Sequence, residues 1–291
     1  VVTISSLPNI LRFNNTSWVS FEGIEFSGAR GTTVSINDGE NITLKKCGIT
    51  NSGYSGVDIR GGNSHSIVGC DIANTGAQAL VIDAGNRNTL ASSNHIVNNN
   101  HIYNFNRLLR TEGAGILLNG VGISIQNNTI HNGPHKGIEV AGNNHLIENN
   151  EIFDVGYETL QSGAIYAPGD WTARGSIITN NYIHNISGFN GSENYAIHLN
   201  NQASGFSITN NLLFNTTFGV YIGGGDDNLV QDNATINVPF AVHLDDRGLT
   251  WQSHTSSTGQ QLIAQLIAIP YQSTAWLENY PNLSFNNVNL F

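Results

Sequence analysis

The 291-residue sequence has few charged side chains and no long apolar run. Only 11% of its residues are charged, about half of the usual share, while Ile, Leu, Val and Phe are spread evenly. This composition excludes a highly charged disordered chain. The formal charge of −10 argues against a nucleic-acid partner. Because no apolar stretch is long enough to cross a bilayer, no membrane span is predicted.

Methionine is absent, and Cys47 and Cys70 are the only cysteines. The lack of an initiator methionine and of a signal peptide is typical of a mature or excised segment starting at Val1. The two cysteines lie one repeat apart, so a disulfide and two stacked, buried thiols are equally expected. No histidine or cysteine cluster has zinc spacing, so neither a metal nor another cofactor is predicted.

Asn, Gly, Ser and Thr take the place of the missing charges, and they create many N-x-S/T sequons. The sequons favour a secreted, extracellular glycoprotein, although the composition alone produces nearly as many by chance. The candidate glycosylation sites are Asn14, Asn15, Asn41, Asn127, Asn185, Asn190, Asn215, Asn233 and Asn282.

Two short patterns recur along the chain at spacings of roughly 22 to 33 residues, which predicts a solenoid. The segments are short, alternate with period two and are separated by Gly and Asn, so the repeat predicts a parallel β-helix. Stacked asparagines satisfy backbone groups at its corners. One pattern, N-N-x-I, starts at Asn99, Asn127, Asn149, Asn180 and Asn210; the other, a small residue before aliphatics, starts at Gly56, Ala79, Gly115, Gly137, Gly163, Ala196, Gly219 and Ala241.

The predicted organisation is one domain over residues 1–291. Coils occupy residues 1–251, and residues 252–291 form a loop, a short helix and a tail that pack on the flank. The helix is expected over Gln260–Ile269, with Ser257 or Thr258 as its cap and Pro270 as its end. The coil from Gly163 to Ala196 is about ten residues longer than its neighbours, and such insertions usually build a binding face. They fall at residues 167–176 and 187–194.

Strand alternation assigns the outward side chains, because in GIEV it turns Ile138 and Val140 inward and Glu139 outward. Single outward positions are expected to be ordinary solvated surface. By contrast, the cluster of Tyr166, Asp170, His198, Tyr221, His243 and Asp245 is expected to form a site for a glycan or polysaccharide. The outward column contains Asp58, Arg60, Val81, Asp83, Leu117, Asn119, Glu139, Tyr166, His198, Asn200, Tyr221, His243 and Asp245.

Glycoside hydrolysis needs two carboxyl groups roughly 5 to 9.5 Å apart. Asp170 has no acidic partner in the next coil, where Asn200 and Asn201 stand. Its candidate partners are Glu158, Asp245 and Asp246. A lyase would need a Lys or Arg base beside the acid groups of its bound substrate. Basic residues are scarce in the half of the chain that contains Asp170.

The segments GAIYAPGDWTARGSIITNNYIHNISG, AIHLNNQASGFSITNNLLFN and AVHLDDRGLTW resemble pectate-lyase-like right-handed β-helix proteins related to the glycoside hydrolase family of α-L-fucosidases and xylanases. The likeness covers nearly the whole chain and implies a right-handed β-helix with Asp170 as a catalytic acid. The family's Leu-Asp-Asp in the next coil is Leu199-Asn200-Asn201 here, and asparagine cannot act as a base or nucleophile. Candidate sugar contacts are Glu139, Tyr166, Trp171, Arg174, His198, Asn200, Tyr221, His243 and Arg247.

Three functions follow as hypotheses. The favoured one is a non-catalytic extracellular β-helix glycoprotein that is structural or binds carbohydrate. The second is an active polysaccharide-degrading hydrolase that uses Asp170 and one further acid, and the third is a lyase or epimerase. Relatives usually carry further coils beyond both ends, so exposed end coils are expected to allow head-to-tail assembly into an oligomer or filament.

Overall fold

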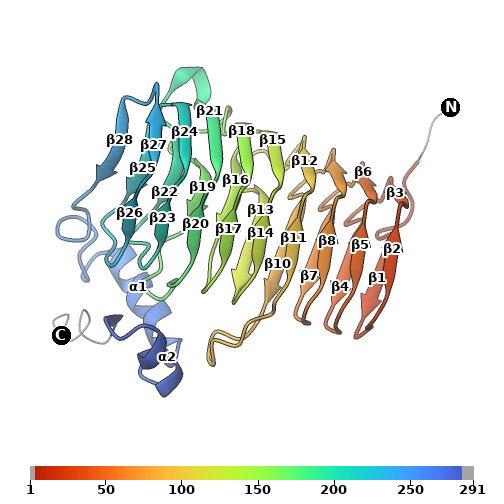
Figure 1. Ribbon diagram of the computed structural model, residues 1–291, viewed down its shortest axis with the longest axis horizontal. Coiled ribbons are helices and arrows are strands. Elements are labelled where there is room, and N and C mark those ends of the chain that lie inside the picture. Colours follow the sequence, from red (N-terminus) through yellow and green to blue (C-terminus); the bar gives the residue numbers. More distant parts are fainter. Residues whose placement is uncertain (1–3, 284–291) are drawn as a thin grey trace.

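The computed structural model describes residues 4–283, which wind into three parallel sheets around one long axis (Figure 1). Successive coils place one strand in each sheet, so strands far apart in sequence lie side by side. Two helices near the C-terminus lie against one flank of this solenoid (Figure 1). The prediction of an all-β parallel β-helix with a short helical C-terminal segment is confirmed.

Sheet 1 is the sheet whose strands carry most of the small-residue repeats. Its order is β1 (Leu11–Asn14), β4 (Val34–Asn37), β7 (Val57–Arg60), β10 (Leu80–Ala84), β13 (Ala114–Gly120), β16 (Lys136–Val140), β19 (Gly163–Ala167), β22 (Tyr195–Leu199), β25 (Phe218–Ile222) and β28 (Phe240–Leu244).

In each coil except the last described one, a strand of sheet 2 and then a strand of sheet 3 follow the strand of sheet 1, and a short corner joins sheets 2 and 3. Sheet 2 contains β2 (Ser20–Glu22), β5 (Thr43–Lys45), β8 (Ser66–Val68), β11 (Ile96–Asn98), β14 (Ser124–Gln126), β17 (Leu146–Glu148), β20 (Ile177–Thr179), β23 (Ser207–Thr209) and β26 (Leu229–Gln231). Sheet 3 contains β3 (Glu25–Ser27), β6 (Gly48–Thr50), β9 (Asp71–Ala73), β12 (His101–Tyr103), β15 (Thr129–Gly133), β18 (Glu151–Val155), β21 (Tyr182–Ile186), β24 (Leu212–Thr216) and β27 (Ala234–Ile236).

The core is a set of aliphatic columns that run along the inside of the solenoid. In sheet 1, Ile36, Ile59 and Ile82 pair in register, and all three are buried. The predicted alternation is also observed, because Ile138 is fully buried while its neighbour Glu139 is partly exposed. Burying each large aliphatic side chain stabilises the fold by about 1.5–3 kcal/mol.

An asparagine ladder closes the corner between sheets 2 and 3. The Oδ1 atom of Asn150 accepts from the backbone N–H of Asn128 at 3.0 Å and from its Nδ2 at 2.9 Å. The Nδ2 of Asn150 donates in turn to the Ile125 carbonyl. The preceding Asn149 adopts a positive φ of 55°, a conformation that asparagine tolerates well. The second asparagine of each N-N pair is therefore internal, and the first makes the turn.

The two cysteines occupy the same ladder in the first coils. Cys70 donates its backbone N–H to Asn100 Oδ1 at 2.8 Å, and Cys47 donates its own to the Cys70 sulfur at 3.4 Å. Both are free, buried thiols, so the disulfide candidate is not formed and the stacked-thiol alternative is observed. Each sulfur satisfies backbone groups as the asparagine amides do, and burial raises the pKa of Cys70 to about 11.

The C-terminal segment packs against the corner between sheets 1 and 2. Helix α1 (Ser257–Ile267) is capped by Ser256 and not by Ser257 or Thr258, so it begins three residues and ends two residues before the predicted range 260–269. A second helix, α2 (Thr274–Asn279), was not expected from the sequence. Leu262 and Leu266 of α1 contact Trp171 and Trp276 in one buried cluster. In the described range 4–283, no helix has the length and apolarity needed to cross a membrane.

The last coil leaves its inward-type side chains accessible. Val242 and Leu244 of β28 are 53% and 71% exposed, whereas Val220 and Ile222, their partners in β25, are buried. Head-to-tail assembly through such a surface stays a prediction.

Candidate functional site

Four of the predicted site residues form one column on the outer face of sheet 1. Tyr166, His198, Tyr221 and His243 pair in register through β19, β22, β25 and β28. The Tyr166 and His198 rings meet edge to face at 5.2 Å, and the Tyr221 and His243 rings stack at 4.9 Å. The sequence pattern therefore identified side chains that are neighbours in space.

A hydrogen-bond network joins this column across its coils. Asn200 Nδ2 donates to the Tyr166 hydroxyl at 2.8 Å, and its Oδ1 accepts from Arg247 Nη1 at 3.1 Å. Arg247 Nη2 donates to the Tyr221 hydroxyl at 2.6 Å and to the Asp245 carboxylate at 2.8 Å. Asn200, which replaces the expected acid, thus links Tyr166 to Arg247, and Arg247 continues the link to Tyr221.

The charges of this network are largely compensated. Hydrogen bonding to Arg247 holds the pKa of Asp245 at about 2, so its carboxylate is ionised in any ordinary buffer. Lys136 Nζ lies 2.8 Å from the Glu139 carboxylate and 4.2 Å from the centre of the Tyr166 ring. These pairs fix the side chains in place and leave little net charge on the face itself.

His198 is the most buried titratable group of the column, with 4% of its surface exposed. Burial, aided by the nearby positive charge of Arg247, lowers its pKa to about 3. The imidazole is therefore neutral at physiological pH. A group with so low a pKa cannot supply a proton there, and both ring nitrogens are buried, so His198 is unsuited to general-acid catalysis.

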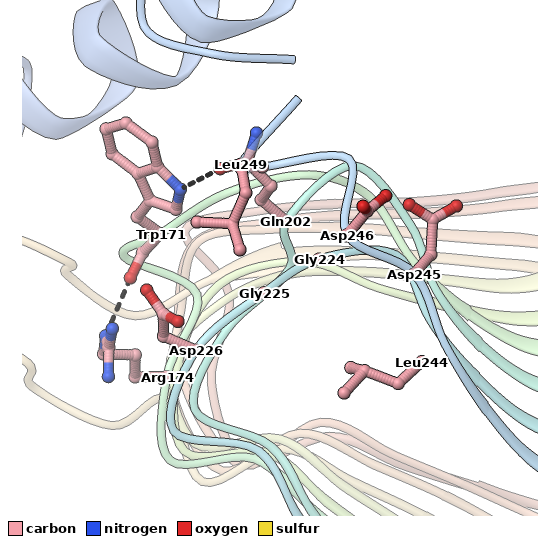
Figure 2. A pocket seen from close by; sticks show the side chains of 11 residues that line it. Trp171, Arg174, Gln202, Gly224, Gly225, Asp226, Leu244, Asp245, Asp246 and Leu249 are labelled. Atoms are coloured by element: carbon pink, nitrogen blue, oxygen red, sulfur yellow. Dashed lines mark hydrogen bonds between the residues drawn. The ribbon is translucent and has the colours of Figure 1, made fainter. Parts of the chain in front are cut away.

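A pocket of about 440 Å³ lies at the corner between sheets 1 and 2, and Figure 2 shows the side chains that line it. Asp245 belongs to both the network and the pocket, and Asp246 lies beside it (Figure 2). Across the pocket, burial and the neighbouring Asp227 raise the pKa of Asp226. The pocket is lined by Trp171, Arg174, Gln202, Gly224, Gly225, Asp226, Leu244, Asp245, Asp246, Gly248 and Leu249.

Asp170 is bound within the corner rather than presented to a substrate. It is 7% exposed, and its Oδ1 accepts from the backbone N–H and the hydroxyl of Thr172 at 2.7 and 2.5 Å. Its Oδ2 accepts from Arg87 Nη2 at 3.1 Å. Arg87 comes from the insertion that follows β10. This carboxylate therefore joins two distant segments of the chain.

Trp171 and Arg174 also serve the packing of this corner, although both border the pocket. The Trp171 indole donates to Gln202 Oε1 at 3.2 Å and lies below α1 (Figure 2). Arg174 donates to the Trp171 carbonyl at 2.8 Å and pairs with the Asp227 carboxylate.

Glu158 lies at a different corner, between sheets 3 and 1. It pairs with Arg110, whose Nε donates to Oε2 at 2.6 Å, and this hydrogen bond lowers the pKa of Glu158. The structure thus brings Asp245 and Asp246 together at the pocket, while Glu158 is not among the pocket residues.

Arg87, Gln202 and Asp226 are site residues that the sequence reasoning missed. Arg87 lies 83 positions from Asp170, in an insertion without a repeat partner, so no local pattern marks it. Asp226 could have been found from the sequence, because it stands in the glycine-rich corner GGGDDN directly after β25, whose Tyr221 had been assigned to the outer face. Among residues 4–283, no group of three or more His, Cys, Asp or Glu is arranged to hold a metal ion.

Comparisons with known proteins agree with this architecture. The family model described as "Right handed beta helix region" matches residues 9–111 and 114–257, so the chain belongs to that family. A solved structure titled "Glycoside hydrolase" is similar with a TM-score of 0.53 and 17% identity, over 72% of this chain. The match covers 38% of that hydrolase, so this chain spans less than half of its length. No curated protein matches the chain. The likeness to the hydrolase shows the fold alone.

Proposed function

We propose that this protein is an extracellular β-helix that binds a glycan without cleaving it, on the outer face of β19, β22, β25 and β28 and in the adjoining pocket. The observation that carries the proposal is the network in which Asn200 and Arg247 join Tyr166, Tyr221 and Asp245. Amide, hydroxyl, guanidinium and carboxylate groups beside aromatic rings are the groups that recognise sugar hydroxyls and ring faces. They are held in place before any ligand arrives, which lowers the entropy cost of binding.

The hydrogen bonds and ion pairs of the acidic side chains favour glycan binding over hydrolysis. Asp170 has both oxygens occupied by Thr172 and Arg87, and Glu158 is paired with Arg110 at another corner. Asp245 accepts from Tyr221, from Arg247 Nη2 and from the Arg247 backbone N–H. A carboxylate held in this way at a pKa of about 2 is a weak base and a poor nucleophile.

A hydrolase is the second candidate, and one observation favours it. Asp226 and Asp245 line the same pocket and have pKa values shifted in opposite directions. Such a divergence is typical of an acid and base pair in glycosidases. In this reading Asp226 is the proton donor and Asp245 is the base.

Calorimetric titration with neutral plant, fungal and bacterial oligosaccharides tests the binding proposal. Asp246→Asn and Leu249→Ser change two exposed pocket residues, and each is expected to weaken binding at least about threefold, the size of one lost surface hydrogen bond or apolar contact. Asp58→Asn, on the same sheet in an early coil, is the matched control and should bind as the wild type does. Loss of affinity in the Asp58 variant alone, or no binding to any glycan, would overturn the proposal.

A further inference from the structure

Trp251 is one of two largely exposed tryptophans in the chain. The chain has four tryptophans, and the other two, Trp171 and Trp276, are buried in a cluster with α1. Trp251 is 64% exposed, and Trp18 in the first coil is 75% exposed. Single exposed apolar residues are common and need no ligand to explain them. The surroundings of each exposed ring therefore decide whether it belongs to a binding site.

Arg247 connects the Trp251 ring with the network of the proposed glycan site. Its guanidinium carbon lies 5.3 Å from the centre of the Trp251 ring and 5.5 Å from that of Tyr221. The Arg247 side chain is 11% exposed, and its hydrogen bonds to Asn200 and Asp245 fix its position. A guanidinium over an aromatic ring is attracted by the negative face of that ring. The indole is thus held in one place and still presents most of its surface to solvent.

The chain around Trp251 also adds apolar surface to the edge of the pocket. Leu244 and Leu249 are 71% and 90% exposed, and both line the pocket (Figure 2). Trp251 follows Leu249 by two positions, so their Cα atoms lie within about 7 Å of each other. Trp18, by contrast, lies between β1 and β2, at the other end of the solenoid from β28. Of the two exposed tryptophans, Trp251 is therefore the one beside the proposed site.

We propose that Trp251 is the stacking platform of the glycan site and that its ligand is a neutral sugar ring lying flat against the indole. This inference rests on the proposed function. The face of an aromatic ring is negative, so it attracts the C–H groups that a sugar ring presents on its own face. Asp226 and Asp246 line the adjoining pocket, and their charge disfavours a ring that carries a carboxylate.

Acrylamide quenching of tryptophan fluorescence tests the contact directly. In the Trp18→Phe variant, Trp251 is the one remaining exposed tryptophan, because Trp171 and Trp276 are buried. The probes are neutral tetrasaccharides of glucose, galactose and N-acetylglucosamine, each added at a saturating concentration determined by calorimetry. A bound tetrasaccharide should lower the quenching constant at least about twofold, because a sugar on the open face covers roughly half of the indole. An unchanged constant at saturation would overturn the platform.

Substitution of Trp251 tests how much the stacking contributes to affinity. Trp251→Leu keeps an apolar side chain without a ring, and it should weaken binding about two- to tenfold, the size of one aromatic contact. Trp251→Phe keeps a smaller ring and should weaken binding less. Trp18→Leu is the matched control and should bind as the wild type does. Circular dichroism should show that every variant is folded.

The outcomes separate this inference from the proposed function. Wild-type affinity in Trp251→Leu, together with weaker binding in Leu249→Ser, would overturn the platform and leave the glycan site in place. Equal losses in Trp251→Leu and Trp251→Phe would also contradict stacking, because the phenyl ring keeps an aromatic face. A wild type that binds no neutral oligosaccharide at all would overturn the proposed function and the platform together.

Discussion

The first coils and the last coils of this solenoid share one cross-section but differ on their outer surface. In the first coils, equivalent residues such as Asn14 and Asn37 are 23 positions apart, and the outer face of sheet 1 carries short or freely solvated side chains. Later, Asn150 and Asn181 are 31 positions apart, and rings cover the same face. The inward aliphatic columns continue unchanged through both regions.

This difference separates the residues that define the fold from those of the proposed site. A coil needs its inward aliphatics and its ladder residue, and both regions supply them. Corner length and outward side chains are free to vary. Ladder residues are 30 positions apart at Cys70 and Asn100 but 22 apart at Asn211 and Asn233, so the proposed glycan site is set apart by its outward rings and not by coil length.

Ion pairs of the two regions should differ most in their contribution to stability. Asp170→Ala leaves Arg87 without its carboxylate in a buried corner, which is expected to lower the free energy of unfolding by about 3–5 kcal/mol. Asp58→Ala removes the partner of Arg60, which is 48% exposed, and should cost at most about 1 kcal/mol. Urea denaturation of both variants measures the difference. Equal losses would show that the Asp170 corner is not a structural anchor.

The ladder should contribute more to stability at a position occupied by asparagine than at one occupied by cysteine. Asn150→Ala removes the acceptor for the Asn128 backbone and the donor to Ile125, which is expected to cost roughly 2–4 kcal/mol. Cys70→Ala removes longer sulfur contacts and should cost about 1–2 kcal/mol. The midpoints of chemical denaturation compare the two variants directly. A larger loss for Cys70→Ala would contradict the assigned order.

Acid should destabilise the protein through its buried neutral histidines. Burial lowers the pKa of His95 and His145 to about 4 and that of His198 to about 3. Below about pH 6.5 the unfolded chain gains protons that the native state does not. The free energy of unfolding should therefore keep its full value above that pH. It should decrease as pH falls towards about 4, by roughly 1.4 kcal/mol per pH unit for each such histidine.

His198→Phe should make this decrease less steep, because it removes one histidine of the proposed site and keeps a ring in place. Denaturation midpoints of the variant and the wild type, measured between about pH 4 and about pH 6.5, test this prediction. The same slope for the variant and the wild type would mean that His198 is protonated in the folded protein.

The negative charge of the pocket should have the smallest of the predicted effects. It should make the protein bind neutral sugars more tightly than acidic ones. Asp226 and Asp246 give the pocket its negative charge, because Asp245 is paired with Arg247 and Arg174 is paired with Asp227. A neutral oligosaccharide should therefore bind about tenfold more tightly than a uronic acid oligomer of equal length, and added salt should reduce the difference. Asp226→Asn should reduce it as well. A preference for the uronic acid oligomer would show that the sugar contacts another surface.

The sequence predicted the features that repeat and missed those that occur once. The small-residue motifs and the N-N-x-I motifs correspond to strands of sheets 1 and 3, because strand alternation and corner turns have periodic signatures. Arg87 and Asp170 meet across 83 positions without any repeat, so local patterns could not join them. Cys70 could be placed in a column but not assigned a partner, since a thiol and an amide can fill the same ladder position.

The same limit applies within the candidate site. The column of Tyr166, His198, Tyr221 and His243 followed from alternation alone, and the structure places these residues side by side. The sequence could not show that Asp170 faces the corner, because its orientation depends on Arg87 and Thr172. It also gave no indication that Trp251 contacts Arg247, because no repeat places the residues that follow β28.

Incubation of the intact protein with neutral and acidic polysaccharides, read by newly formed reducing ends, tests the central claim most directly. We expect no release above that of a heat-inactivated sample, with at least one of the same glycans bound in the calorimetric titration. Release of reducing ends by the wild type that disappears in Asp245→Asn and Asp226→Asn, with both variants still folded, would contradict the non-catalytic assignment. That result would identify the pocket as the active site of a hydrolase.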